Sequence, residues 1–61
     1  MTKKNIIKDI RFNLKYQRTH KSEVIRLTGL PNLWWLTDDE FLKFTKARLM
    51  EILEDIEMIS I

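Results

Sequence analysis

Residues 37–61 have the sequence TDDEFLKFTKARLMEILEDIEMISI, and this stretch decides the fold class. Its apolar residues recur in alternating steps of three and four, which is the spacing of one face of an α-helix. Thr37 opens the stretch and Glu40 lies three residues later, a pair typical of a capping box. We therefore expect one long C-terminal helix that begins after Thr37.

The apolar seam of this helix is the predicted packing surface. Its members are Phe41, Leu42, Leu49, Ile52, Leu53, Ile56 and Ile59, with Thr45 between Leu42 and Leu49. The residues that flank the seam form no consistent ladder of opposite charges, which argues against a parallel two-stranded zipper. A stripe this wide is typical of a helical bundle whose core is completed within one chain or by a second copy.

Two shorter helices are predicted upstream. The first covers residues 3–18 and has one apolar face, made of Ile6, Ile7, Ile10 and Leu14. The second begins with Ser22 as its N-cap and ends at Gly29, the only glycine, which suits the left-handed position after a helix. No segment has the alternation of a strand. The sequence predicts an all-α fold, a single small three-helix domain over residues 1–61.

The composition predicts association. The chain has 61 residues, eight Ile, eight Leu and no cysteine, so neither a disulfide nor a thiolate metal site stabilises it. A domain this small supplies little stability from one core, and many such domains are oligomers. We expect a homodimer, or a partner that covers the remaining apolar surface. No signal peptide is indicated, and the uncharged residues 27–37 fall short of the roughly 20 that span a bilayer. These features favour the cytoplasm, with no membrane partner.

Catalytic signals are almost absent. His20 is the only histidine, and the chain offers no cysteine and no glycine-rich loop. His20 with Glu23, or the acids of residues 38–40, could bind a cation, but a linker histidine and helix-start acids explain them more simply. We expect no enzyme, no metal, no cofactor and no small-molecule substrate.

A basic face follows the first predicted helix. Its members, Lys4, Lys8, Arg11, Lys15 and Arg18, are spaced four and three apart and therefore share one side. Like charges on one face repel, so something must screen or neutralise them. The candidates are water and salt, the acidic face of residues 51–57, or an external anion, either DNA phosphate or an acidic patch of a protein.

Two adjacent tryptophans are the predicted partner-binding site. Trp34 and Trp35 diverge, so both cannot face one core, and at least one is expected at the surface together with Leu30 and Leu33. Tryptophan is over-represented among residues that dominate binding energy. The alternative is that both rings are buried by the fold or by a dimer.

Residues 22–30, SEVIRLTGL, resemble the first helix and turn of a helix-turn-helix of the excisionase or mercury-regulator type. In that family Glu-Val is followed, after two residues, by Leu-Thr-Gly and a hydrophobic residue. The resemblance implies that residues 31–36 belong to a helix that enters the major groove. A scaffold of this kind turned to protein contact is the other possibility. In general style the chain also resembles small accessory regulators of Gram-positive bacteria and their phages.

These features lead to one functional hypothesis and one alternative. The first is a non-catalytic regulator that binds and modulates a protein, such as a transcription or replication factor of host or phage. The alternative is a DNA-binding helix-turn-helix regulator, in which the basic face and Arg26 contact phosphates and Asn32 contacts a base edge.

Overall fold

The protein is all-α in the computed structural model, which describes residues 2–16 and 20–59, with Tyr16 as backbone only. The helices are α1 (Lys3–Tyr16), α2 (Lys21–Thr28), α3 (Asp38–Leu42) and α4 (Lys46–Ile59), with a short 3-10 helix, η2 (Leu33–Trp35). Within those two ranges there is no strand. The predicted all-α class is confirmed, and so is a long C-terminal helix, over Lys46–Ile59. The described residues form four α-helices where three were predicted.

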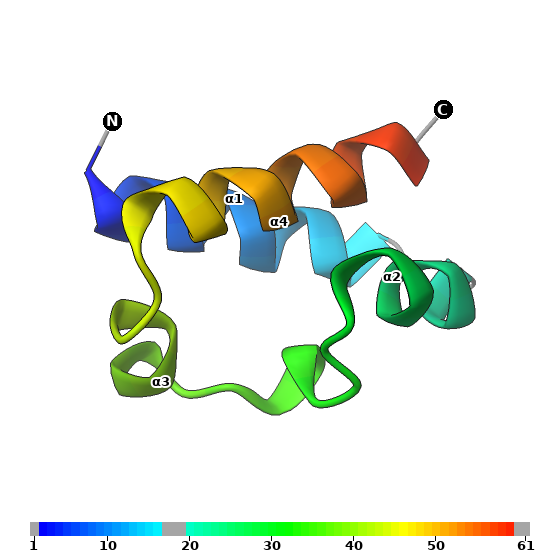
Figure 1. Cartoon of the computed structure of the whole chain (residues 1–61), viewed down its shortest axis with the longest axis horizontal. Helices are drawn as coiled ribbons and strands as arrows, with labels where there is room; N and C mark the ends of the chain where they lie inside the picture. The colour runs from blue at the N-terminus through cyan, green and yellow to red at the C-terminus, as the bar shows by residue number, and fades with distance from the viewer. Residues whose placement is uncertain (1, 17–19, 60–61) are drawn as a thin grey trace.

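The first and last helices form the centre of the fold. Figure 1 shows α1 and α4 side by side and running in the same direction, and the two helices contact each other. The chain between them returns along one side of this pair. In the returning segment α2 packs against α4, and α3 packs against α1 at the end where both long helices begin.

The core is filled almost entirely by aliphatic side chains. From α1 and α4 come Ile6, Ile7, Ile10, Leu14, Leu49, Ile52, Leu53 and Ile56; Val24, Leu33, Leu36 and Phe41 come from the returning segment. Burial of a side chain of this size stabilises a fold by about 1.5–3 kcal/mol. Most of the predicted seam is thus buried inside a single chain, which favours the interpretation that the seam belongs to an intramolecular core.

The predicted continuous helix after Thr37 is wrong at residues 43–45. The capping box itself is present: the Glu40 N–H donates to Thr37 Oγ1, and the Thr37 N–H donates to Glu40 Oε1. However, α3 ends at Leu42. Thr45 then caps a separate helix, because its Oγ1 accepts from the Arg48 N–H at 3.1 Å.

The break makes the molecule more compact than an unbroken helix would allow. A straight helix over residues 37–59 would be about 34 Å long at the usual rise per residue. The whole molecule measures only 27 × 20 × 17 Å along its principal axes. Folding α3 back against α1 buries Phe41 completely and leaves Leu42 at the surface. The prediction that Leu42 belongs to the packing seam is therefore wrong. Ile59, at the far end, is half-buried.

The boundaries of α2 follow local chemistry. Its N-cap is His20, with no side-chain bond, so the prediction of Ser22 as the cap is wrong. Gly29 has φ 70° and donates its N–H to the Ile25 carbonyl at 2.8 Å, which confirms the predicted left-handed stop. The buried Thr28 donates its hydroxyl to the Val24 carbonyl at 2.7 Å, so no polar group is left unsatisfied there.

Candidate functional site

The exposed side of α1 carries the predicted basic face. Lys4, Lys8 and Lys15 are exposed on it, and none of them has a carboxylate partner within residues 2–16 and 20–59. Arg18, the fifth predicted member, lies outside the described residues. The three lysines therefore present positive charge to solvent along one side of the helix.

Arg11 has a different role from the lysines beside it. Its Nη2 donates to the Leu36 carbonyl at 3.0 Å and to Asp38 Oδ1 at 2.7 Å. Its guanidinium carbon also lies 5.1 Å from the centroid of the Phe41 ring. Through these contacts Arg11 holds α1 against the segment that leads into α3. Its carboxylate partner is Asp38. It does not pair with any residue of the acidic stretch 51–57.

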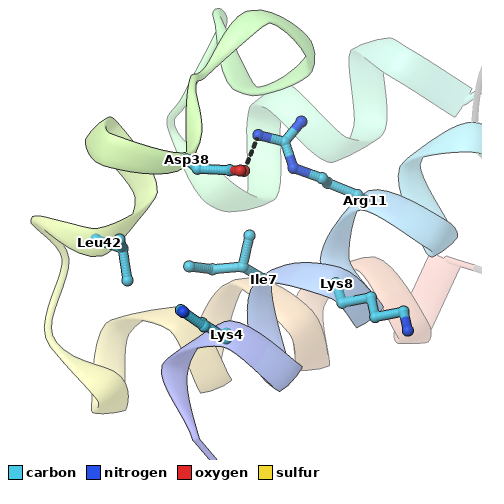
Figure 2. Close-up of a pocket in the computed structure, with 6 residues that line it drawn as sticks. All are labelled: Lys4, Ile7, Lys8, Arg11, Asp38 and Leu42. Carbon is cyan, nitrogen blue, oxygen red and sulfur yellow. Dashed lines mark hydrogen bonds and ion pairs between the residues drawn. The ribbon is translucent and has the colours of Figure 1, made fainter.

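Between α1 and α3 lies a surface pocket of about 670 Å³. The residues that line it are Lys4, Ile7, Lys8, Arg11, Asp38 and Leu42. Figure 2 shows the Ile7 and Leu42 side chains between Lys4 on one side and the Arg11–Asp38 pair on the other. The pocket therefore combines an apolar middle with three cations and a single carboxylate. Such a lining suits an anion that also carries an apolar group.

The two tryptophans have different environments. The Trp34 ring is half-buried against the core, and its Nε1 donates to the Leu14 carbonyl at 3.2 Å. The Trp35 side chain is 68% exposed. The Lys21 ammonium lies 4.3 Å from the Trp35 ring centroid and 5.3 Å from that of Trp34. One cation thus covers part of both indoles, a contact worth roughly 0.5–1 kcal/mol at an exposed site.

The two leucines of the predicted partner-binding site are less available. Leu33 is only 1% exposed and belongs to the core, so its predicted place at the binding surface is wrong for this fold. Leu33 is buried because η2 turns it inward while its neighbour Trp35 faces out. Leu30 is half-buried and packs against the core. The accessible part of the predicted site is therefore Trp35, with the outer parts of Trp34 and Leu30.

The segment after Gly29 is short. Residues 31 and 32 form a turn, and Asn32 precedes the three residues of η2. A helix-turn-helix would place its base-reading helix at this point of the chain. The structure has a single 3-10 turn here, and the resemblance of residues 22–30 stays a prediction.

Other exposed apolar side chains were not part of any predicted site. Phe12 on α1 is 62% exposed, and Met58 near the end of α4 is 68% exposed. Phe12 could have been found from its spacing, because it is four residues from Lys8 and three from Lys15. Met58 follows Glu54 by four residues, which also places it on the solvent side of α4.

The described part of the chain holds no group of three or more His, Cys, Asp or Glu side chains that could bind a metal ion. Over the same residues, no helix has the length and apolar character needed to cross a bilayer. Comparison with protein-family models, with curated proteins and with solved structures finds no match to this chain. What the protein does must therefore be inferred from its own surface.

Proposed function

We propose that this chain is a non-catalytic regulatory protein that binds and modulates a protein partner, and that Trp35 is the anchor of the contact. The partner class that we favour is a transcription or replication factor. The observation that carries the proposal is the 68% exposure of Trp35 in a domain whose other aromatic side chain in η2 is bound to the core. Tryptophan is one of the side chains enriched among binding hot spots.

The backbone around Trp35 supports this role. Leu33 and Leu36 are buried on either side of it, and the Trp35 N–H donates to the Asn32 carbonyl at 3.0 Å. Trp34 is held through its bond to Leu14. A side chain presented from a backbone that is already ordered loses less entropy on binding. The indole is therefore a preorganised contact.

Lys21 adds charge to this surface. Its ammonium lies over the Trp35 ring and leaves the partner a cation beside the indole. A carboxylate of the partner can pair with Lys21 while an apolar pocket of the partner receives the ring. This combination favours a protein partner with an acidic rim around an apolar pocket.

The test is affinity capture from the cells that express the chain, with Trp35→Ala compared against the unmodified protein. Met58→Ala is the matched control, because Met58 is equally exposed and lies on a different helix. We expect a specific partner to be lost with Trp35→Ala and kept with Met58→Ala. If the Trp35 variant retains every captured protein, the proposal that Trp35 is the anchor is overturned.

Direct DNA binding is the second candidate function. Its support is the set of exposed lysines Lys4, Lys8 and Lys15, which have no carboxylate partner in the part of the chain the structure describes. Arg26 is less available because it pairs with Glu23 at 2.5 Å, while Asn32 is exposed. Binding of plain duplex should weaken with salt, with a logarithmic slope of about −0.9 for each phosphate contacted. Absence of a mobility shift at low salt would eliminate this candidate.

The homodimer predicted from the sequence stays a proposal, with a revised interface. Phe41, Leu49, Ile52 and Ile56 are buried within one copy and are not available to a second. Among the side chains that the structure describes, the large exposed apolar ones are Phe12, Leu27, Leu42 and Met58, besides Trp35, and a dimer interface is expected to use some of them. Light scattering decides the point, since a mass of one chain at micromolar concentration rules the dimer out.

A further inference from the structure

We propose that the pocket between α1 and α3 binds an acidic peptide segment of the partner protein, with an apolar side chain seated between Ile7 and Leu42. The inference rests on the proposed function in one respect, that the partner is a protein. It adds a second contact, separate from Trp35, and it states the chemistry of the segment that is bound.

The charges of the pocket favour an acidic occupant. Three cations line it, and only Arg11 has a carboxylate partner, Asp38 at 2.7 Å. Lys4 and Lys8 have no such partner among residues 2–16 and 20–59. Two carboxylates of a bound segment can therefore pair with the lysines without displacing any contact that holds the fold together.

The apolar middle of the pocket selects among acidic ligands. Two apolar residues line it: Ile7, which is buried, and Leu42 at the end of α3, which is 38% exposed. An apolar side chain of the ligand can cover Leu42 and remove this surface from water, which favours binding. A ligand with charge alone leaves this part of the pocket unused.

The neighbouring acids argue for a peptide over nucleic acid. Asp38 lines the pocket itself, and the exposed Asp39 and Glu40 follow it in α3. A duplex carries a phosphate charge about every 1.7 Å along its axis, so it would bring phosphates close to these carboxylates. A short peptide places its few charges at the lysines and avoids that repulsion.

The experiment is fluorescence anisotropy with the full chain and a short labelled peptide in which one leucine is flanked on both sides by acidic residues. We expect saturable binding that Lys4→Gln and Lys8→Gln each weaken about threefold, because an exposed ion pair contributes a factor of roughly 1.5–5. Lys15→Gln is the matched control, since it removes the same charge from the same side of α1 outside the pocket. We expect it to change the affinity less than twofold.

The apolar contact has its own test. Replacing the peptide leucine with serine, or Leu42 with serine in the protein, should each weaken binding several-fold. Thermal unfolding of the Leu42 variant, followed by circular dichroism, verifies that it is folded. Lys8→Glu should bind a peptide whose acidic residues are exchanged for lysine better than the unmodified protein does, which a folding defect would not produce.

Several results would overturn the proposal. These are equal effects of the Lys15 and Lys8 substitutions, indifference to the peptide leucine, or tighter binding of labelled duplex DNA with equal dependence on all three lysines. Failure of Trp35 as an anchor is a separate outcome. Trp35→Ala should leave peptide binding unchanged, because Trp35 does not line the pocket.

Discussion

Arg48 of α4 donates from Nη2 to the backbone carbonyl of Thr28 at 2.6 Å, and it thereby joins the last turn of α2 to the central helix pair. The final carbonyls of a helix have no partner within it, and Thr28 is a buried residue. The guanidinium of Arg48 therefore satisfies a group that would otherwise be left without a bond next to the core.

We expect Arg48→Met to lower the free energy of unfolding by about 1–3 kcal/mol, because a carbonyl next to the core loses its charged donor. Urea denaturation measures the change. Arg26→Met is the control, since the Arg26–Glu23 pair is exposed and such pairs contribute about 1 kcal/mol or less. Equal losses of unfolding free energy in the two variants would show that the bond to Thr28 contributes no more than an exposed ion pair.

Thr45→Ala tests the break between α3 and α4. As the N-cap of α4, Thr45 accepts from the Arg48 N–H, and its loss should lower stability by about 1 kcal/mol. In an unbroken helix the same change would stabilise the protein, because alanine favours a helix over threonine by up to about 0.7 kcal/mol. The sign of the change in denaturation midpoint therefore distinguishes two helices from one.

The two indoles should differ in accessibility. Trp34→Phe leaves only the exposed Trp35, whose fluorescence should be strongly quenched by acrylamide. Trp35→Phe leaves the half-buried Trp34, which should be protected. Trp34→Phe also removes the bond to the Leu14 carbonyl, at about 1 kcal/mol of stability, whereas Trp35→Phe should be close to neutral. Equal quenching of the two variants would contradict the assignment of Trp35 as the exposed ring.

Gly29→Ala should destabilise the protein by about 1–2 kcal/mol, the strain of a left-handed backbone for a residue with a Cβ atom. Beyond the two neighbouring residues in the chain, no heavy atom lies within 4 Å of the added Cβ, so the backbone conformation is the cause. Gly29→Asn should cost less, since asparagine tolerates this conformation better. Thermal unfolding measures both, and an alanine variant as stable as the original would refute the explanation.

Local chemistry was predictable from the sequence. The capping box at Thr37 and Glu40 and the stop at Gly29 each depend on residues within four positions of one another, and both are confirmed. The break at Thr45 was missed because Leu42 and Leu49 keep heptad spacing across it. The signal that could have found it was the polar Thr45 in the middle of an apolar seam.

Contacts between distant segments could not be predicted from the sequence. The bond from Arg11 to Asp38 joins residues 27 positions apart, and it exists only because α3 folds back against α1. This same fold brings Ile7 and Leu42 to one pocket and separates Lys15 from Lys4 and Lys8. The helical periodicity predicted the basic face, but tertiary packing decided which of its members share a site.

The pairing of α1 with α4 makes the order of synthesis important. Ile6 and Ile10 of α1 share one core with residues of α4, so the ribosome must translate residues 46–59 before this core can form. Until then this apolar face is open to chaperones, to proteases and to other nascent chains. The long sequence separation of this contact also predicts slower folding than in helical proteins built from neighbouring helix hairpins.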